Sequence, residues 1–281
     1  MRCLLVAAGL IASMTDAFAG GFELPVLRGS DAYVQPPRLV NWSGFYGGGQ
    51  VGYGVASMDF ATSTRELVAH MLRELALESE QQPSQWQVLG KSNTGGSSAG
   101  FFFGYNNRWE DVILGFEFNY SRVSFASSAP VSPITRVTSA GGNTFLVNIT
   151  GGASMHITDL ATVRARAGAS VENFLPYAMI GVAVGRANLS RTATVSGQQN
   201  PTIPPIPCDA FATPPCVPFS FTEAESKAGA FLLGWSLGGG VDVMVMPNVF
   251  LRAEYEYLAF APIWDIKSAI NTVRVGAGFK F

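Results

Sequence analysis

The C-terminal segment of this chain restricts its fold more than any other feature. Over residues 273–281, apolar side chains occupy every second position, and basic or glycine residues fill the positions between them. A period of two indicates a β-strand, because successive side chains point to opposite faces. One face of this strand must meet an apolar environment, whereas the other carries Arg274 and Lys280. The chain therefore contains at least one strand with a charged face and a continuous apolar face.

The N-terminus predicts export. Arg2 precedes the apolar run 4–12, and Ala17 and Ala19 supply the small residues that a cleavage site requires. The alternative is a retained membrane anchor, which would need about 20 apolar residues, more than this run provides. The predicted organisation is a signal peptide over residues 1–19, an exposed N-terminal tail over 20–42 and a folded domain over 43–281.

Composition then restricts the folded domain. The chain is 48% hydrophobic and 14% charged with 31 glycines, against about 25% charged in soluble domains. After the signal, no apolar run reaches the length of a transmembrane helix. The membrane structure open to such a chain is a closed β-barrel, in which every backbone group pairs between strands. The net charge of −2 gives no reason to expect a nucleic-acid partner.

Eight segments have strand character, and their connections alternate between short and long. The segments are 44–56, 97–108, 111–125, 159–171, 174–190, 229–245, 249–257 and 271–281. The long connections are 57–96, 126–158, 191–228 and 261–267. Short periplasmic turns and longer extracellular loops are typical of outer-membrane barrels. We therefore predict an all-β fold, an eight-stranded antiparallel transmembrane β-barrel with long extracellular loops, located in the bacterial outer membrane.

One segment complicates this assignment. Residues 144–157 are β-prone, and a separate strand there would raise the number to nine. Nine strands would place the two chain ends on opposite sides of the membrane and break the alternation of loop lengths. We interpret 144–157 as the outer extension of the fourth strand.

The same alternation predicts which charged side chains face the barrel interior. The inward set is Glu117, Arg164, Arg166, Asp242, Arg252, Glu254, Glu256, Arg274 and Lys280. Eight strands enclose a space just wide enough for their own side chains, and buried charges of opposite sign should pair. The favoured interpretation is a hydrogen-bonded plug, and the alternative is an ion-selective channel. The terminal aromatic residues Phe279 and Phe281 are predicted to form the C-terminal signal that barrel-assembly machinery recognises.

Residues 64–80, in the first long connection, differ from the rest of the chain. Leu67, Met71 and Leu75 recur at helical spacing among charged residues, which predicts a short amphipathic helix that Thr64 could cap. His70 lies in this helix as a candidate ligand of haem iron or a metal. A lone surface histidine is more often simply solvated, so no metal or cofactor site is assigned.

The third long connection is rich in proline and contains both cysteines that follow the signal, Cys208 and Cys216. In an oxidising compartment this pair could close a small disulfide loop, and two free thiols are the alternative. The prolines predict an irregular, exposed surface loop.

Several segments resemble the small alphaproteobacterial outer-membrane proteins described as a porin family or as immunogenic outer-membrane proteins. They are residues 42–54 (WSGFYGGGQVGYG), 162–168 (TVRARAG), 174–177 (FLPY), 251–257 (LRAEYEY) and 271–276 (NTVRVG). The resemblance implies an eight-stranded outer-membrane barrel with surface-exposed loops. It implies no cofactor and transfers no ligand residues.

Three functional classes follow. The first is a structural barrel for envelope integrity and surface interaction, and the second is a small porin-like channel. The third, a binder of a ligand such as haem or a lipid-modifying enzyme, is the weakest, because Ser154 and His156 share one strand face but no nucleophile motif surrounds them. We therefore do not expect an enzyme. The expected partners are outer-membrane lipid, the barrel-assembly machinery during biogenesis, and a surface ligand or envelope protein; the oligomeric state is left open.

Overall fold

The computed structural model describes residues 40–281, apart from 111, 201–210 and 212–213. The predicted signal peptide, most of the predicted tail and Cys208 lie outside these residues. Within them, no helix is both long and apolar enough to cross a membrane.

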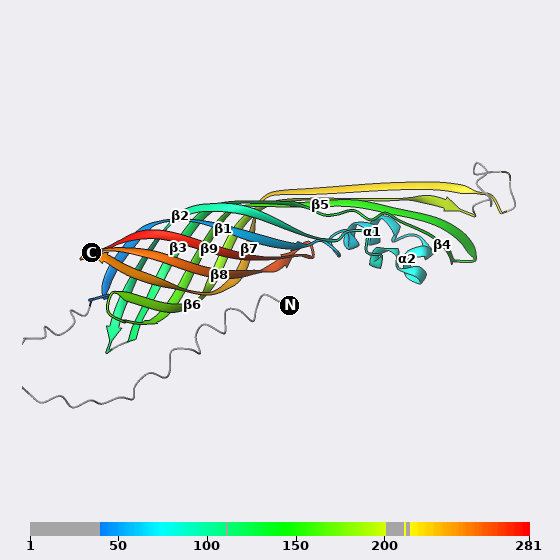
Figure 1. Ribbon diagram of the computed structural model, residues 1–281. Coiled ribbons are helices and arrows are strands. Elements are labelled where there is room, and N and C mark those ends of the chain that lie inside the picture. The colour runs from blue at the N-terminus through cyan, green and yellow to red at the C-terminus, as the bar shows by residue number, and fades with distance from the viewer. Residues whose placement is uncertain (1–39, 111, 201–210, 212–213) are drawn as a thin grey trace, which may run out of the picture. The chain divides into compact units, whose positions relative to one another are not determined.

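Eight strands close into an antiparallel ring, which confirms the predicted all-β barrel (Figure 1). Each strand pairs with its neighbours in the order β1-β2-β3-β5-β6-β7-β8-β9, and β1 pairs with β9 to close the ring. The bounds are β1 Gly44–Asp59, β2 Lys91–Trp109, β3 Val112–Ser128, β5 Asn143–Ala169, β6 Phe174–Gln199, β7 Val217–Met246, β8 Val249–Ile263 and β9 Ile266–Lys280.

A ninth strand lies outside the ring. β4, Ile134–Ala140, pairs only with the first part of β5, so the two form a hairpin beyond the barrel. β5 itself runs without interruption through residues 144–157. The interpretation of 144–157 as the outer extension of the fourth barrel strand is therefore confirmed, whereas β4 was not predicted.

The strands β5, β6 and β7 continue far beyond the barrel (Figure 1). The connection 191–228, predicted as a long loop, is mostly strand in its described residues, and so are residues 126–143, which precede the predicted strand extension; that part of the prediction is wrong. Pro218, predicted to lie in irregular structure, is inside β7. β7 pairs with β8 only from Gly234 onward, so Pro218 lies where one edge of β7 has no partner strand within the part of the chain that the structure describes, and proline is tolerated there.

The projecting part of this sheet has the polarity of a soluble protein. On β5 and β6, Val147, Ile149 and Val195 are buried, whereas Asn148 and Thr194 are half-buried on the opposite face. The barrel has the reverse arrangement, because there the polar side chains face inward. The projecting strands therefore need a cover on their inner face rather than lipid on their outer one.

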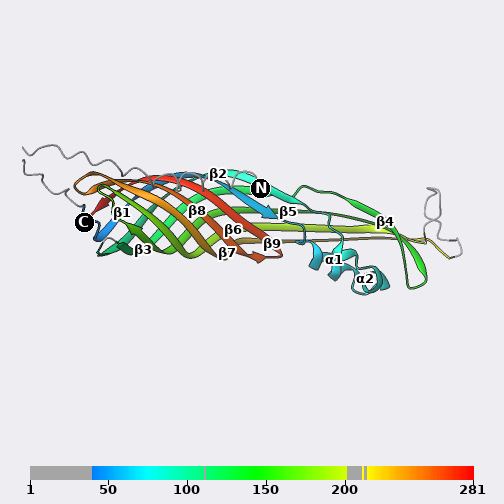
Figure 2. The same cartoon turned by 60° about the horizontal axis from the view of Figure 1, so that its bottom comes forward.

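Two short helices provide this cover. α1, Arg65–Leu72, and α2, Ala76–Gln81, are followed by the 3-10 turn η1, Pro83–Gln85, and lie beside the projecting strands (Figure 2). The side chains of Leu67, Val68, Leu72 and Leu77 are buried in one apolar cluster with the sheet. The amphipathic helix predicted over 64–80 is thus present, broken into two pieces. Thr64 occupies the N-cap position but makes no side-chain capping bond, so its predicted role is wrong.

Irregular pairing marks the level at which the barrel gives way to the projecting sheet. The register shifts between β3 and β5 at Arg122/Phe125, between β5 and β6 at Ile157/Asp159, and between β6 and β7 at Ala187/Leu189. An extra residue in one strand reverses which of its side chains face inward. β5 gains such a residue at Thr158, and β7 gains one next to Gly229, which has a φ of 65°.

Candidate functional site

The barrel interior is built in three layers, which can be read along β8. The inward side chains of this strand are Phe250, Arg252, Glu254, Glu256, Leu258 and Phe260, and all are buried. Because every second residue faces inward, the strand carries an aromatic residue, then three charged residues, then two apolar residues through the interior. The neighbouring strands add residues of the same kind at each level.

Glu117 of β3 is the centre of the charged layer. Its carboxylate accepts hydrogen bonds from Arg252 Nη1 at 2.8 Å and Arg166 Nη1 at 3.4 Å, and it contacts Arg164 Nη2. Arg164, 1% exposed, also donates from Nη1 to Glu254 Oε1 at 2.7 Å. One carboxylate therefore joins three arginines that belong to two opposite walls of the barrel.

The remaining acids complete the layer. Asp242 accepts from Arg166 Nη2 at 2.7 Å and from Arg252 Nε at 2.8 Å. Arg274 donates to Glu254 Oε1 at 2.7 Å and contacts Glu256. We call these eight side chains the interior ion network: Glu117, Arg164, Arg166, Asp242, Arg252, Glu254, Glu256 and Arg274. With four arginines and four carboxylates it has no net charge, which lowers the cost of burying the ions.

Aromatic side chains support the network, and the sequence did not indicate them. The hydroxyl of Tyr46 donates to Glu117 at 2.8 Å, and that of Tyr177 donates to Glu254 at 3.0 Å. The guanidinium of Arg166 lies 3.8 Å from the centroid of the Tyr177 ring, and that of Arg252 lies 4.0 Å from the Phe102 ring. These contacts add cation–π attraction to the ion pairs. The register of β1 and β6 against their neighbours is the signal that would have assigned both tyrosines to the interior.

An apolar layer closes the interior on the side of the short turns. It contains Trp42, Tyr46, Phe102, Ile113, Leu175, Met244 and Phe250. Trp42, the last residue of the predicted N-terminal tail, is 3% exposed. A hollow of about 10 Å³ beside Trp42 and Phe250 has room for about one water molecule. Lys280, predicted to join the charged set, lines this hollow and makes no ion pair with any described residue.

A second apolar layer closes the opposite side of the network. Within the ring it includes Met58, Phe125, Leu232, Leu258 and Ile270, each no more than 1% exposed. This layer is continuous with the apolar cluster under α1 and α2. The interior ion network is thus enclosed between two apolar layers.

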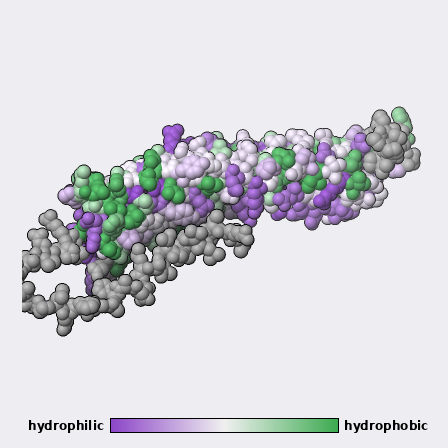
Figure 3. Space-filling model, in the orientation of Figure 1, coloured by the Kyte–Doolittle hydropathy of each residue, from purple (hydrophilic) through white to green (hydrophobic). Residues whose placement is uncertain are grey.

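The outer wall of the ring carries the reverse pattern. Its exposed side chains are apolar, and Figure 3 shows them gathered over the barrel, whereas the projecting part is more polar. Aromatic residues mark both borders of this apolar belt. On the side of the projecting sheet they include Tyr53, Phe231 and Tyr255, and on the side of the short turns Phe45, Tyr105, Trp109, Phe279 and Phe281. Such girdles mark the two membrane interfaces of a transmembrane barrel. Phe279 and Phe281, which are predicted to form the assembly signal, have side chains that are 46% and 73% exposed.

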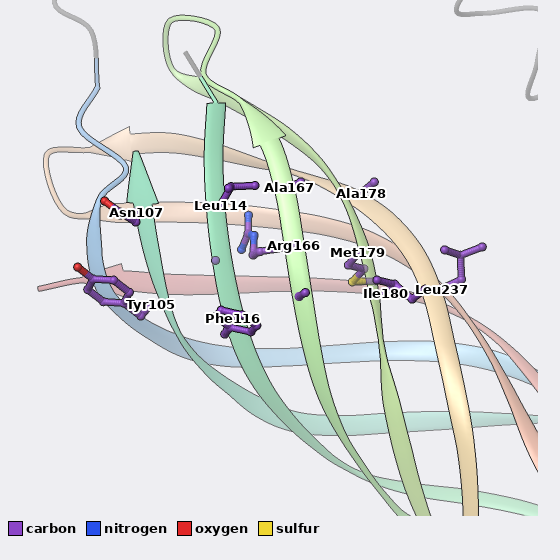
Figure 4. Close-up of a pocket in the computed structure, with 12 residues that line it drawn as sticks. Tyr105, Asn107, Leu114, Phe116, Arg166, Ala167, Ala178, Met179, Ile180 and Leu237 are labelled. Atoms are coloured by element: carbon purple, nitrogen blue, oxygen red, sulfur yellow. The ribbon is translucent and has the colours of Figure 1, made fainter. Parts of the chain in front are cut away.

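A shallow depression of about 730 Å³ lies on this wall (Figure 4). Ala165, Ala167 and Ala178 belong to its floor, and the larger side chains around them include Leu114, Phe116, Ile180 and Leu237. Arg166 and Met179 also line it, although their side chains are buried. Its exposed side chains are almost all apolar, so it belongs to the lipid-facing belt rather than to a polar binding site.

A charge placed in the middle of this belt should destabilise the protein. Phe116 is 71% exposed on β3, with Leu114 and Phe118 on either side of it on the same face. We expect Phe116→Arg to lower the free energy of unfolding by about 2–4 kcal/mol, because the arginine would lie near the bilayer midplane. Urea unfolding in lipid vesicles measures this. Ser124→Arg, on the same strand face beyond the belt, should change stability by less than about 1 kcal/mol; equal effects would contradict the assigned belt.

The candidate haem or metal ligand His70 and the candidate catalytic residues Ser154 and His156 lie in the projecting region. His70 Nδ1 lies 2.6 Å from Glu223 Oε1, and its Nε2 accepts from Arg73 at 2.8 Å, so both ring nitrogens are engaged. Ser154 Oγ is hydrogen-bonded to Ser190 Oγ at 2.8 Å. His156 lies two residues further along the same face of β5. The described part of the chain holds no group of three or more metal-ligating side chains.

Cys216 is buried and disulfide-bonded. Since Cys208 lies outside the described residues, its pairing with Cys216 stays a prediction.

The closed ring, the enclosed charges and the lipid-facing belt together define a transmembrane β-barrel. Residues 30–281 match the model of the outer membrane protein beta-barrel domain, and the chain belongs to this family. It is therefore an outer-membrane β-barrel.

Among solved structures, the chain is similar to Neisserial surface protein A, with 15% identity and a TM-score of 0.39 over 85% of this chain and 98% of that one. The attachment invasion locus protein Ail of Yersinia pestis also has 15% identity, with a TM-score of 0.32 over 85% of this chain and 99% of that one. The translocator domain of the autotransporter NalP from Neisseria meningitidis has 12% identity and a TM-score of 0.28, over 86% and 90% of the two chains. No curated protein matches the sequence.

Proposed function

We propose that this protein is a non-conducting outer-membrane barrel that anchors and displays the projecting sheet and helices at the cell surface. The observation that carries the proposal is the interior ion network, which is neutral, fully buried and enclosed between two apolar layers. A water path through the barrel would have to cross both layers and separate ion pairs that span the interior. Eight strands leave little room for such a path.

The projecting region is the proposed interaction surface. Its outer face is lined by hydroxyl-bearing side chains, among them Ser154, Ser190, Thr194 and Thr222, which pair across the strands. Among the described residues, the edge of β7 before Gly234 has no partner strand. The projecting part of β7, Val217 to Gly229, extends about 40 Å at the usual rise per residue. A surface of this size, held rigidly by three barrel strands, suits contact with an envelope protein or an external ligand.

We further propose a subfamily, an export route and a role in the envelope. The segments at 42–54, 162–168 and 251–257 support membership of the small alphaproteobacterial porin-like or immunogenic subfamily. Residues 1–19 would be removed on export, and the exposed Phe279 and Phe281 would be read by the barrel-assembly machinery. A role in envelope integrity follows from the rigid interior. Ser154 and His156 have no catalytic part in this function.

Conductance is the direct test. We expect the mature protein, refolded and inserted into planar lipid bilayers, to give no stable channels, because both apolar layers exclude water from the charged interior. The mobility shift between unboiled and boiled samples on a gel reports the folded fraction in the same preparation.

Stable, reproducible channels from folded wild-type protein would overturn the proposal and favour the porin-like alternative. In that case Arg274→Gln should change the ion selectivity of those channels, because Arg274 would then line the conducting path. Glu74→Gln, on the exposed surface of the segment between α1 and α2, is the matched control with one altered charge outside the barrel.

A further inference from the structure

Three charged side chains lie side by side on the outer wall of the barrel. Arg122 of β3 is directly opposite Asp159 of β5, and Asp159 is directly opposite Arg186 of β6. Neighbouring strands are about 4.8 Å apart, so the two arginines leave the wall about 10 Å from each other. Both are exposed, and Asp159 is half-buried between them. We call this set the arginine pair with its central aspartate.

The set lies at the outer border of the lipid-facing belt. The next outward side chain toward the membrane is Tyr120 on β3 and Val184 on β6, followed by Phe118 and Val182. In the other direction the next outward residues are the polar Ser124 and Asn188. The two guanidinium groups are therefore held at the depth at which lipid headgroups begin.

The central aspartate is already satisfied by neutral donors. Its Oδ1 accepts from the Tyr120 hydroxyl at 2.7 Å, and its Oδ2 accepts from Thr158 Oγ1 at 2.7 Å. In the part of the chain that the structure describes, no carboxylate lies within ion-pair distance of Arg122 or Arg186. The set thus has a net charge of +1 and presents two guanidinium groups with unused donors toward the headgroup region.

The backbone irregularities at this level shape the set. Thr158, which donates to Asp159, is the extra residue of β5. On β7, Gly229 has a φ of 65°, and a Cβ there would lie 3.2 Å from Nε and Nη2 of Arg186. The N–H of Gly229 donates to Asn188 Oδ1 at 2.9 Å. Glycine is thus suited to this position both by its backbone angle and by the guanidinium that lies over it.

We propose that Arg122 and Arg186 bind the phosphate groups of a phosphorylated glycolipid headgroup in the outer leaflet. Arginine matches phosphate with paired, charge-assisted hydrogen bonds, and basic residues at a membrane border attract anionic headgroups. The depth of the set selects a lipid rather than a soluble ligand, and its net positive charge selects an anionic one. Binding on one side of the barrel would fix both its height in the membrane and its rotation.

A second set in the same protein serves as a matched control. Asp59 of β1 is directly opposite Lys91 of β2 and Lys267 of β9. Here Lys91 Nζ is in an ion pair with Asp59 Oδ2 at 3.2 Å. On β1 the polar Ser57 separates Asp59 from Val55, the last apolar residue of the belt, so this set lies further from the membrane. It has the same number of cations without the depth or the free guanidinium groups.

The test is a titration of the purified, folded protein with bisphosphorylated lipid A in a zwitterionic detergent, followed by native mass spectrometry of the complexes. We expect R122Q/R186Q to raise the Kd by about tenfold or more, since each arginine supplies a charge-assisted bond. K91Q/K267Q, with the same change in net charge, should stay within about twofold of wild type. D159N, which removes the central negative charge, should bind more tightly than wild type.

Each outcome decides the proposal, provided that the gel mobility shift shows every variant to be folded. Selective weakening in R122Q/R186Q, together with loss of the difference on fully dephosphorylated lipid A, supports it. Equal weakening in both double variants would show attraction to net charge alone and would overturn it. Unchanged binding by R122Q/R186Q, or a difference that persists on dephosphorylated lipid A, would also overturn it.

Discussion

Glu117→Ala is expected to lower the free energy of unfolding of the barrel by about 3–5 kcal/mol, the usual effect of removing one partner from a buried ion pair. The carboxylate is the common acceptor of Arg164, Arg166 and Arg252, and it also accepts the Tyr46 hydroxyl. Its loss leaves a net positive charge in a closed interior, where no other described carboxylate is left without an arginine. Urea unfolding of the protein refolded into lipid vesicles, followed by tryptophan fluorescence, measures the change.

The control for this prediction is Glu74→Ala, whose side chain is 86% exposed and which should change stability by less than about 0.5 kcal/mol. The double variant Glu117→Met with Arg164→Met should be less destabilised than the sum of the two single methionine variants, because it removes opposite charges together. A loss below about 1 kcal/mol in Glu117→Ala would show that water reaches the network, and would weaken the case for a closed interior.

Leu72→Asp is expected to separate the two helices from the projecting sheet while the barrel stays folded. Leu72 is fully buried in the cluster shared by α1 and the strands β5 and β6. Burying a carboxylate there, together with the lost apolar contacts, should cost more than about 4 kcal/mol, which exceeds what a two-helix cover can withstand. Limited proteolysis should then cut between residues 60 and 90, and hydrogen exchange should rise in α1 and α2.

The membrane-embedded ring provides the internal reference for this second prediction, since its gel mobility shift should not change. Ser79→Asp adds the same charge to an exposed position of α2 and should leave the protease pattern as in the wild type. Global loss of the folded band in Leu72→Asp would contradict the view that the helical cover is a separable part of the structure.

The charged interior could be predicted because β8 and β9 alternate without a break. Arg252, Glu254 and Arg274 are each flanked by apolar residues on both sides, and an eight-stranded ring has a fixed, narrow interior. The alternation can be read from neighbouring residues, and the narrow interior follows from the number of strands, so the sequence alone was enough to predict the charged interior. The ring closure itself followed from the alternation of loop lengths.

Other features depended on pairing that the sequence does not display. Tyr46 and Tyr177 lie on glycine- and alanine-rich strands, where small residues on both faces hide the alternation. The extra residues at Thr158 and beside Gly229 reverse the inward set in the middle of β5 and β7, so a single strand appears as two unrelated patterns. The projecting parts of β6 and β7 were predicted as loops because their inner face is apolar and their outer face is polar, the opposite of a lipid-facing strand.

The wide sequence separation within the interior ion network has a consequence for biogenesis. Glu117 meets Arg252 across 135 residues, and Arg164 meets Glu254 across 90. A partly inserted sheet would therefore expose unpaired charges to the bilayer until β8 and β9 arrive. A slip of one residue between β9 and β1 would also turn Arg274 out to lipid and Val273 inward. The interior ion network therefore disfavours incomplete or misregistered barrels, because its charges are all paired only in a completed ring with the correct register.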